Sequence, residues 1–135
     1  MTHSIFKFKL NEVGIGGTEM KPIVMEKVQK VLDNFTNKEV YIHLETTNGA
    51  YASHFNDNAY NVGAFIRNAK VSFNHAKIVG DGKTYRVGLK MDIGWIYAEG
   101  VTDWEMLDEQ LLMAGHDREG RLMVALQISE KPFRY

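Results

Sequence analysis

The spacing of hydrophobic residues changes once along this chain of 135 residues, and that change constrains the fold more than any other feature. From Pro22 to Asn37 the apolar residues are spaced as on one helix, and from Glu39 onward many fall at every second position. A period of two is typical of strands, whose successive side chains point to opposite faces of a sheet. One helix followed by strands predicts a mainly β, antiparallel domain, because a parallel sheet needs helices between its strands.

The segment KPIVMEKVQKVLDNFTNK carries the helix pattern. Its apolar residues form one stripe: Ile23, Val24, Val28, Val31, Leu32 and Phe35. The opposite face carries Lys27, Lys30 and Asp33, so we expect one side to pack on a core and the other to meet water. Pro22 suits the first helical turn, where its missing N–H has no partner to lose. Asn37 is the expected stop.

The strands are predicted from alternation and from the turn residues between them. EVYIHLETT alternates Val40, Ile42 and Leu44 with other side chains, and Asn48-Gly49 follows as the signal of a two-residue hairpin. Further strands are expected at Val62–Ile66, Ala69–Phe73, Ala76–Val79, Thr84–Met91, Gly94–Glu99, Leu111–Gly115 and Arg121–Ser129. TDWEMLDEQ is expected to be a polar crossover with room for one helical turn. Gly120 is expected to take the left-handed position in the hairpin turn HDREG.

Composition and charge exclude several classes of protein. The chain has no cysteine, which excludes disulfides, thiolate zinc sites and cysteine nucleophiles and fits a reducing compartment. The net charge is −1, and no cluster of Lys and Arg indicates a nucleic-acid partner. No apolar run approaches the roughly 20 residues that span a bilayer, and no secretory signal is present. We therefore expect a cytoplasmic protein with neither a nucleic-acid nor a membrane partner.

The stretch GIGGTEMK follows an alternating run and precedes the helix, as a phosphate-binding loop would. It lacks both the G-x-G-x-x-G spacing and the G-K-[ST] ending, so nucleotide binding is not supported. Gly16-Gly17 can instead be encoded by a purine-rich ribosome-binding sequence, and Met20 follows at the distance of a start codon. This suggests that residues 1–19 are a translated, poorly ordered leader and that residues 20–135 form a single domain.

The hairpin at Asn48-Gly49 predicts a cluster of chemically active side chains. With a two-residue turn, His43 pairs with His54, and Glu45 points to the same side of the sheet. Two imidazoles and a carboxylate are ligands that Zn²⁺ or Fe²⁺ accepts, and a histidine oriented by a carboxylate can serve as a general base. The alternative, which we favour, is a half-exposed polar face with hydrogen-bonded histidines.

A second candidate site lies in MDIGWIYAEG. Trp95 and Tyr97 share a face, and with Arg86 on the preceding strand they could line a ligand cleft. They could also be core residues, and for Trp95 we favour the core, because large aromatic side chains dominate small β cores. His116-Asp117 is expected to be turn chemistry, since Asp there caps backbone N–H groups. No G-x-S-x-G motif supports a serine hydrolase.

Several segments together carry a family resemblance: NKEVYIHLETTNGAYASHF, GAFIRNAKV, YRVGLKMDIGWIYAEG, LLMAGHD and VALQISEKPF. From Met20 to about Phe133 the sequence resembles the YojF family, small uncharacterised proteins of Bacillus and relatives. The resemblance implies a distorted, barrel-like β-sandwich with one N-terminal amphipathic helix packed on it. It implies no established activity, so no catalytic residue is carried over. Members are often encoded beside a zinc-dependent deacetylase of bacillithiol biosynthesis, which implies an accessory role in low-molecular-weight thiol metabolism.

Two hypotheses follow from the sequence. The first, which we favour, is a non-enzymatic binding or accessory protein that forms a homo-oligomer or binds that deacetylase. The alternative is a small metal-binding protein or metal-dependent enzyme that holds a divalent metal with His43, Glu45 and His54.

Overall fold

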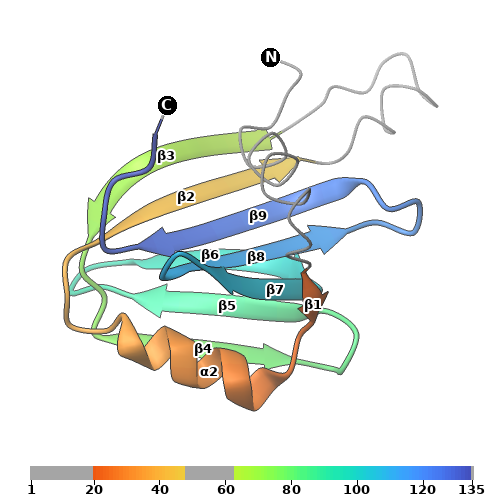
Figure 1. Cartoon of the computed structure of the whole chain (residues 1–135), viewed down its shortest axis with the longest axis horizontal. Coiled ribbons are helices and arrows are strands. Elements are labelled where there is room, and N and C mark those ends of the chain that lie inside the picture. Colours follow the sequence, from red (N-terminus) through yellow and green to blue (C-terminus); the bar gives the residue numbers. More distant parts are fainter. Residues whose placement is uncertain (1–19, 48–62, 135) are drawn as a thin grey trace.

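The computed structural model describes residues 20–47 and 63–134, and their strands form two antiparallel sheets (Figure 1). In chain order the elements are β1 (Lys21–Pro22), α2 (Met25–Asn34), β2 (Val40–Thr47), β3 (Gly63–Val71), β4 (His75–Gly80), β5 (Tyr85–Lys90), β6 (Trp95–Val101), β7 (Asp103–Leu107), β8 (Gln110–His116) and β9 (Leu122–Ser129). The large sheet has the order β1-β7-β8-β9-β2-β3, and the small sheet has the order β4-β5-β6. The prediction of a mainly β, antiparallel domain is confirmed. The two sheets form a sandwich-like arrangement and do not close into a barrel.

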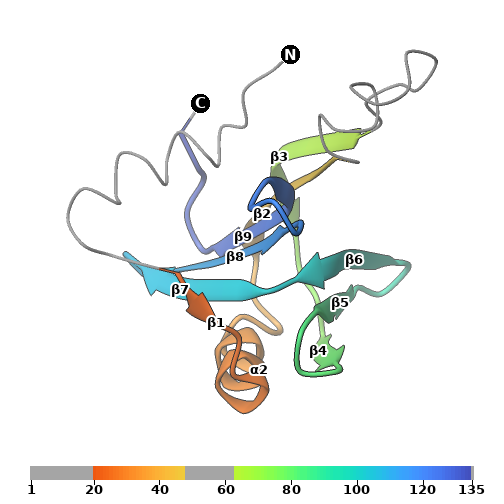
Figure 2. The same ribbon diagram turned by 90° about the vertical axis from the view of Figure 1, so that its right-hand side faces the viewer.

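The core lies between the large sheet on one side and the small sheet with α2 on the other (Figure 2). Alternate residues of the longer strands face it, including Ile42 and Leu44 of β2 and Val87 and Leu89 of β5. The helix contributes Val28, Leu32 and, just beyond its end, Phe35, as the apolar stripe predicted. A second, smaller apolar cluster around Leu112, Ala114 and Ala125 lies on the outer face of the large sheet.

The helix begins at Met25, three residues later than expected. Lys21 and Pro22 instead pair with Trp104 and Asp103 at the edge of the large sheet. Ile23 continues this extended segment by donating its N–H to the carbonyl oxygen of Thr102 at 3.1 Å. Pro22 is tolerated there because an edge position can lack an N–H donor.

The prediction that TDWEMLDEQ is a polar crossover is wrong, because this segment contains strand β7 and the turn to β8. Asp108 and Glu109 both have positive φ, at 51° and 64°, and they connect Leu107 to its partner Gln110. The alternation of Trp104 and Met106 with Glu105 was the available strand signal. The turn contains neither Asn nor Gly, so no hairpin signal was present in the sequence at this position.

Two predicted strands, Val62–Ile66 and Ala69–Phe73, are one strand in the structure, β3. The register against β2 shifts between Ile42 and His43, and Asn68 is the extra residue, with φ at 62°. A bulge of this kind disturbs the alternation of side chains, so a single strand resembles two in the sequence. Gly120 has φ at 78°, as predicted.

No helix within residues 20–47 and 63–134 combines the length and the apolar character needed to cross a membrane. The predicted leader, residues 1–19, and the turn at Asn48-Gly49 lie outside the described residues, and they stay predictions.

Candidate functional site

His43 lies in the middle of β2 on the outer face of the large sheet, the face turned away from the small sheet. Its side chain is fully buried. Its cross-strand neighbours are Arg67 of β3 and Gln127 of β9. Both edges of β2 are therefore occupied at this position, and the hairpin register that pairs His43 with His54 is wrong.

The physical reason is tertiary: β9, from the other end of the chain, takes the place beside β2. His54 lies outside the described residues, so a cluster of His43, Glu45 and His54 stays a prediction. Within the described residues, no three His, Asp or Glu side chains form a group able to hold a metal ion. His43 and Glu45 alone would supply two ligands.

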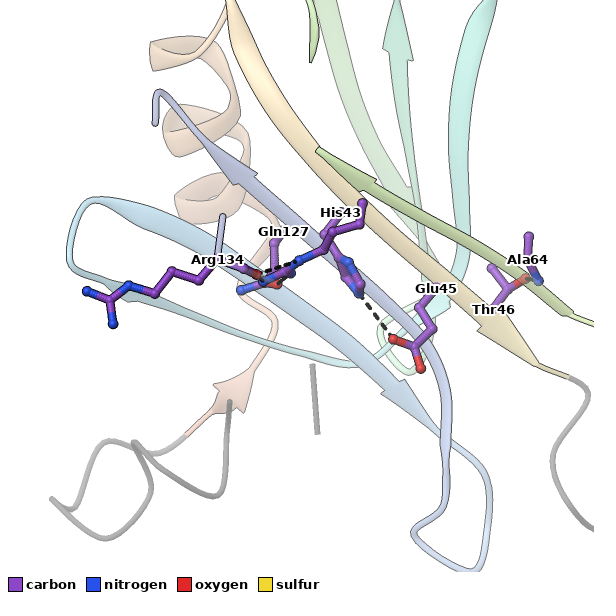
Figure 3. Close-up of polar contacts among 7 residues, drawn as sticks. His43, Glu45, Thr46, Ala64, Gln127 and Arg134 are labelled. Carbon is purple, nitrogen blue, oxygen red and sulfur yellow. Dashed lines mark hydrogen bonds and ion pairs between the residues drawn. The ribbon is translucent and has the colours of Figure 1, made fainter. Parts of the chain in front are cut away.

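His43 and Glu45 do contact each other, as expected for residues two apart on one strand (Figure 3). The distance from Nε2 of His43 to Oε1 of Glu45 is 3.1 Å, and the Glu45 side chain is 14% exposed. The ring of Phe65 meets the imidazole edge to face, with centroids 5.2 Å apart. A carboxylate on one ring nitrogen orients the imidazole and favours a proton on that nitrogen, which is the arrangement used in both metal binding and base catalysis.

Arg67, which the sequence did not single out, connects this site to the C-terminal segment. Its Nη1 donates to Oε1 of Gln127 at 3.2 Å, and its Nε donates to the backbone oxygen of Arg134 at 3.1 Å. Its guanidinium lies over the ring of Phe133, 4.8 Å from the centroid. Asn68 adds two hydrogen bonds to the backbone of Phe133. The C-terminal segment is thus fastened along β3.

Gln127 was also missed, although a single amide in the apolar strand LMVALQIS was a usable signal. It belongs to a cross-strand row on the outer face that contains Glu105, Leu112, Gln127, His43 and Arg67. Nε2 of Gln127 and Oε1 of Glu105 are buried and have no hydrogen-bond partner in the part of the chain that the structure describes. Burial raises the pKa of the Glu105 carboxyl, and the charge of Lys21 partly opposes this.

The second candidate site lies on the outer face of the small sheet. Trp95 is 44% exposed and Tyr97 is 49% exposed, so the assignment of Trp95 to the core is wrong. The core-facing residues of β6 are Ile96 and Ala98, and the alternation of the strand places both aromatic rings outside. The rings stack on each other, with centroids 5.4 Å apart and an angle of 7° between their planes.

Gly88 of β5 lies directly opposite Tyr97 and makes room for these rings. A Cβ atom on Gly88 would lie 3.0 Å from Cε1 of Tyr97 and 3.5 Å from Cζ3 of Trp95. A Cβ atom at this position would therefore require the Tyr97 ring to move by a few tenths of an ångström.

Arg86 completes this group. Its Nε donates to Oε1 of Glu99 at 2.6 Å, and its guanidinium carbon lies 5.4 Å from the centroid of Tyr97. The hydrogen bond to Glu99 raises the pKa of Arg86. Arg86 and Glu99 also line a shallow depression of about 340 Å³ with Val79, Asp81 and Tyr85. Trp95 and Tyr97 do not line this depression. The three residues predicted to line a cleft therefore lie on one face of the sheet but do not line one pocket together.

Asp117 has the turn role expected of it. Its Oδ1 accepts from the backbone N–H groups of Glu119 and Arg121, each at 2.9 Å. These hydrogen bonds, the one from Arg121 first, lower the pKa of the Asp117 carboxyl. Asp117 therefore serves the β8–β9 connection, whereas His116 is the last residue of β8 and its Nδ1 lies 3.9 Å from Oδ1 of Asp103.

Comparisons with known proteins agree with the resemblance seen in the sequence. Residues 22–133 match the model of a family described as "Protein of unknown function (DUF1806)". The uncharacterized protein YojF of Bacillus subtilis (strain 168) is 55% identical over 115 residues, which cover 84% of this chain and 98% of that protein. The crystal structure of the Bacillus subtilis YojF protein matches with a TM-score of 0.73 and 50% identity, and the match covers 87% of this chain and 100% of that chain.

Proposed function

The chain belongs to the YojF family (DUF1806), whose function is not established, and on that premise we propose that it is a non-enzymatic binding or accessory protein. The observation that carries this proposal is the exposed, stacked pair Trp95 and Tyr97 beside Arg86. Trp, Tyr and Arg are the residue types that dominate binding energy at protein interfaces. Two adjacent large rings that are each about half exposed present an apolar surface that a partner can bury.

The proposed partner is the zinc-dependent deacetylase of bacillithiol biosynthesis that the family resemblance implies. The proposed compartment is the cytoplasm, in keeping with a chain that has no cysteine. The accessory role is binding to the enzyme and adjusting its rate. Self-association through the same face is the competing form of the proposal.

The test uses the purified full chain and the purified deacetylase. We expect a complex in size-exclusion chromatography with light scattering, and a change in the deacetylase rate that saturates as this protein is added. The chain alone, measured at the same concentrations, shows whether it forms homo-oligomers. Separate elution together with an unchanged rate would remove the deacetylase from the proposal.

The contact between His43 and Glu45 favours a second candidate function, binding of a divalent metal. A buried imidazole with a carboxylate 3.1 Å away is half of a typical zinc or iron site, and His54 is the proposed third ligand. Elemental analysis of protein purified without a histidine tag tests this proposal. Stoichiometric zinc or iron that is lost in both His43→Ala and His54→Ala would support it. Metal-free protein whose melting curve is unchanged by added zinc would contradict it.

A further inference from the structure

The outer face of the small sheet carries its side chains in three cross-strand rows. The rows are Val79, Arg86 and Glu99; Lys77, Gly88 and Tyr97; and His75, Lys90 and Trp95. The two aromatic residues lie on β6. Lys90 on β5 lies directly opposite Trp95, and Lys77 on β4 is separated from Tyr97 by Gly88. We call this set of nine residues the aromatic platform.

The charges of the aromatic platform are not balanced. Arg86 is neutralised by its ion pair with Glu99. Lys77 and Lys90 have no ion pair in the part of the chain that the structure describes. The platform therefore presents two lysines that form no ion pair within the described residues beside two exposed rings, on a chain whose net charge is −1.

The platform is also ordered before any partner arrives. Trp95 stacks on Tyr97, the guanidinium of Arg86 lies near the ring of Tyr97, and Glu99 holds Arg86 in place. Side chains that are already fixed lose little rotamer freedom on binding, and this lowers the cost of association.

We infer that the aromatic platform docks an acidic protein surface, whose carboxylates meet Lys77 and Lys90 and whose apolar side chain packs on Trp95. This inference rests on the proposed accessory function and specifies its contact face and the chemistry of the partner. A nucleic acid fits less well, because two lysines neutralise few phosphates and Glu99 adds a negative charge beside the rings. A protein surface needs only a central aromatic anchor and a charged rim.

The experiment measures binding of the purified deacetylase to the full chain by calorimetry, at salt concentrations of about 0.05 and about 0.3 M. Trp95→Ala is expected to weaken binding by tenfold or more, as for an interface anchor. The double variant Lys77→Glu, Lys90→Glu is expected to weaken it further and to reverse its salt dependence, because the new carboxylates repel an acidic partner and salt screens that repulsion. The matched control is Lys27→Glu, Lys131→Glu, which makes the same charge change at two exposed lysines that are not among the nine platform residues. Circular dichroism checks that each variant is folded.

A second probe separates failure of the inference from failure of the proposed function. A synthetic peptide of about twelve residues, with Asp and Glu flanking a Leu, is titrated into the isotope-labelled chain, and the same peptide with Lys for Asp and Glu is the control. We expect shifts at Lys77, Lys90, Trp95 and Tyr97 with the acidic peptide only.

Each combination of results has a definite meaning. If the deacetylase binds and the platform variants do not weaken it, the platform inference is overturned and the accessory function stands. If the deacetylase does not bind but the acidic peptide shifts the platform, the deacetylase is the wrong partner and the inference stands. If neither the deacetylase nor the acidic peptide binds at the platform, the inference is overturned.

Discussion

The side-chain carboxamide of Gln29 accepts a hydrogen bond from the backbone N–H of Ile78. Its Oε1 accepts from the N–H of Ile78 at 3.0 Å, and its Nε2 donates to the carbonyl oxygen of Ala76 at 2.8 Å. Ala76 and Ile78 lie on β4, an edge strand of the small sheet, so a side chain of α2 takes the place that a neighbouring strand would occupy. Unpaired strand edges invite association with other chains, and this arrangement pairs one donor and one acceptor of that edge.

The first prediction follows from this contact. Gln29→Ala leaves a backbone donor and a backbone acceptor of β4 without partners, and we expect it to lower the free energy of unfolding by about 1–3 kcal/mol. It should also increase self-association, because the edge is opened. Urea denaturation and light scattering measure the two effects. Lys27→Ala, at an exposed position of the same helix, is the control. Equal stability of the two variants would show that the carboxamide does not close the edge.

The second prediction concerns Gly115, where β8 passes close to the end of β6. A Cβ atom there would overlap the carbonyl oxygen of Gly100 and would lie 2.8 Å from Cγ1 of Val124. Because a backbone atom cannot move aside, we expect Gly115→Ala to cost about 3 kcal/mol or more. Gly120→Ala tests the alternative that replacing any glycine lowers the stability by a similar amount. Gly120 has open space around its Cβ position and a φ of 78°, so only the conformational cost of about 1–2 kcal/mol applies. Thermal denaturation should rank the two variants in this order.

The third prediction concerns Asn68, which combines a positive φ with two hydrogen bonds. Its Oδ1 accepts from the N–H of Phe133 at 2.7 Å, and its Nδ2 donates to the Phe133 carbonyl oxygen at 2.9 Å. Asn68→Gly removes the hydrogen bonds but suits the backbone, so we expect a loss of about 1–2 kcal/mol. Asn68→Ala removes the hydrogen bonds and also places a residue with a Cβ atom at a positive φ. It should therefore cost about 1 kcal/mol more than Asn68→Gly. Identical denaturation midpoints for the two variants would contradict a role for the backbone conformation.

The fourth prediction is a pH dependence that arises from Glu105. Burial raises the pKa of this carboxyl above its ordinary value of 4.5. As the pH rises above that value, the unfolded chain releases this proton before the folded protein does, so the contribution of Glu105 to stability falls. Glu105→Gln removes the titration and should gain stability relative to the natural sequence from about pH 4.5 upward.

Thermal denaturation from about pH 4 to about pH 8 measures this difference. Glu109→Gln, in the exposed turn of the same hairpin, controls for the loss of a negative charge. A stability difference between Glu105→Gln and the natural sequence that does not change with pH would contradict the prediction.

The sequence by itself determined the local features of this protein. The stripe of Val28, Leu32 and Phe35 identified the helix, and alternation identified most of the strands. The contact between His43 and Glu45 was also predictable, because residues two apart on a strand share a face. These features depend on the backbone period and on turn residues, which act over a few positions.

The tertiary structure alone decided which distant segments became neighbours. His43 meets Arg67 and Gln127 rather than a residue of a tight hairpin, because β9 arrives from 84 residues later in the chain to pair with β2. Trp95 faces solvent because the small sheet turns that side of β6 outward, and the same pairing gathers it with Lys77 and Lys90. The pairing of distant strands depends on burying both sheets around one core. Such pairing is a property of the whole chain, so it cannot be predicted from any single stretch of residues.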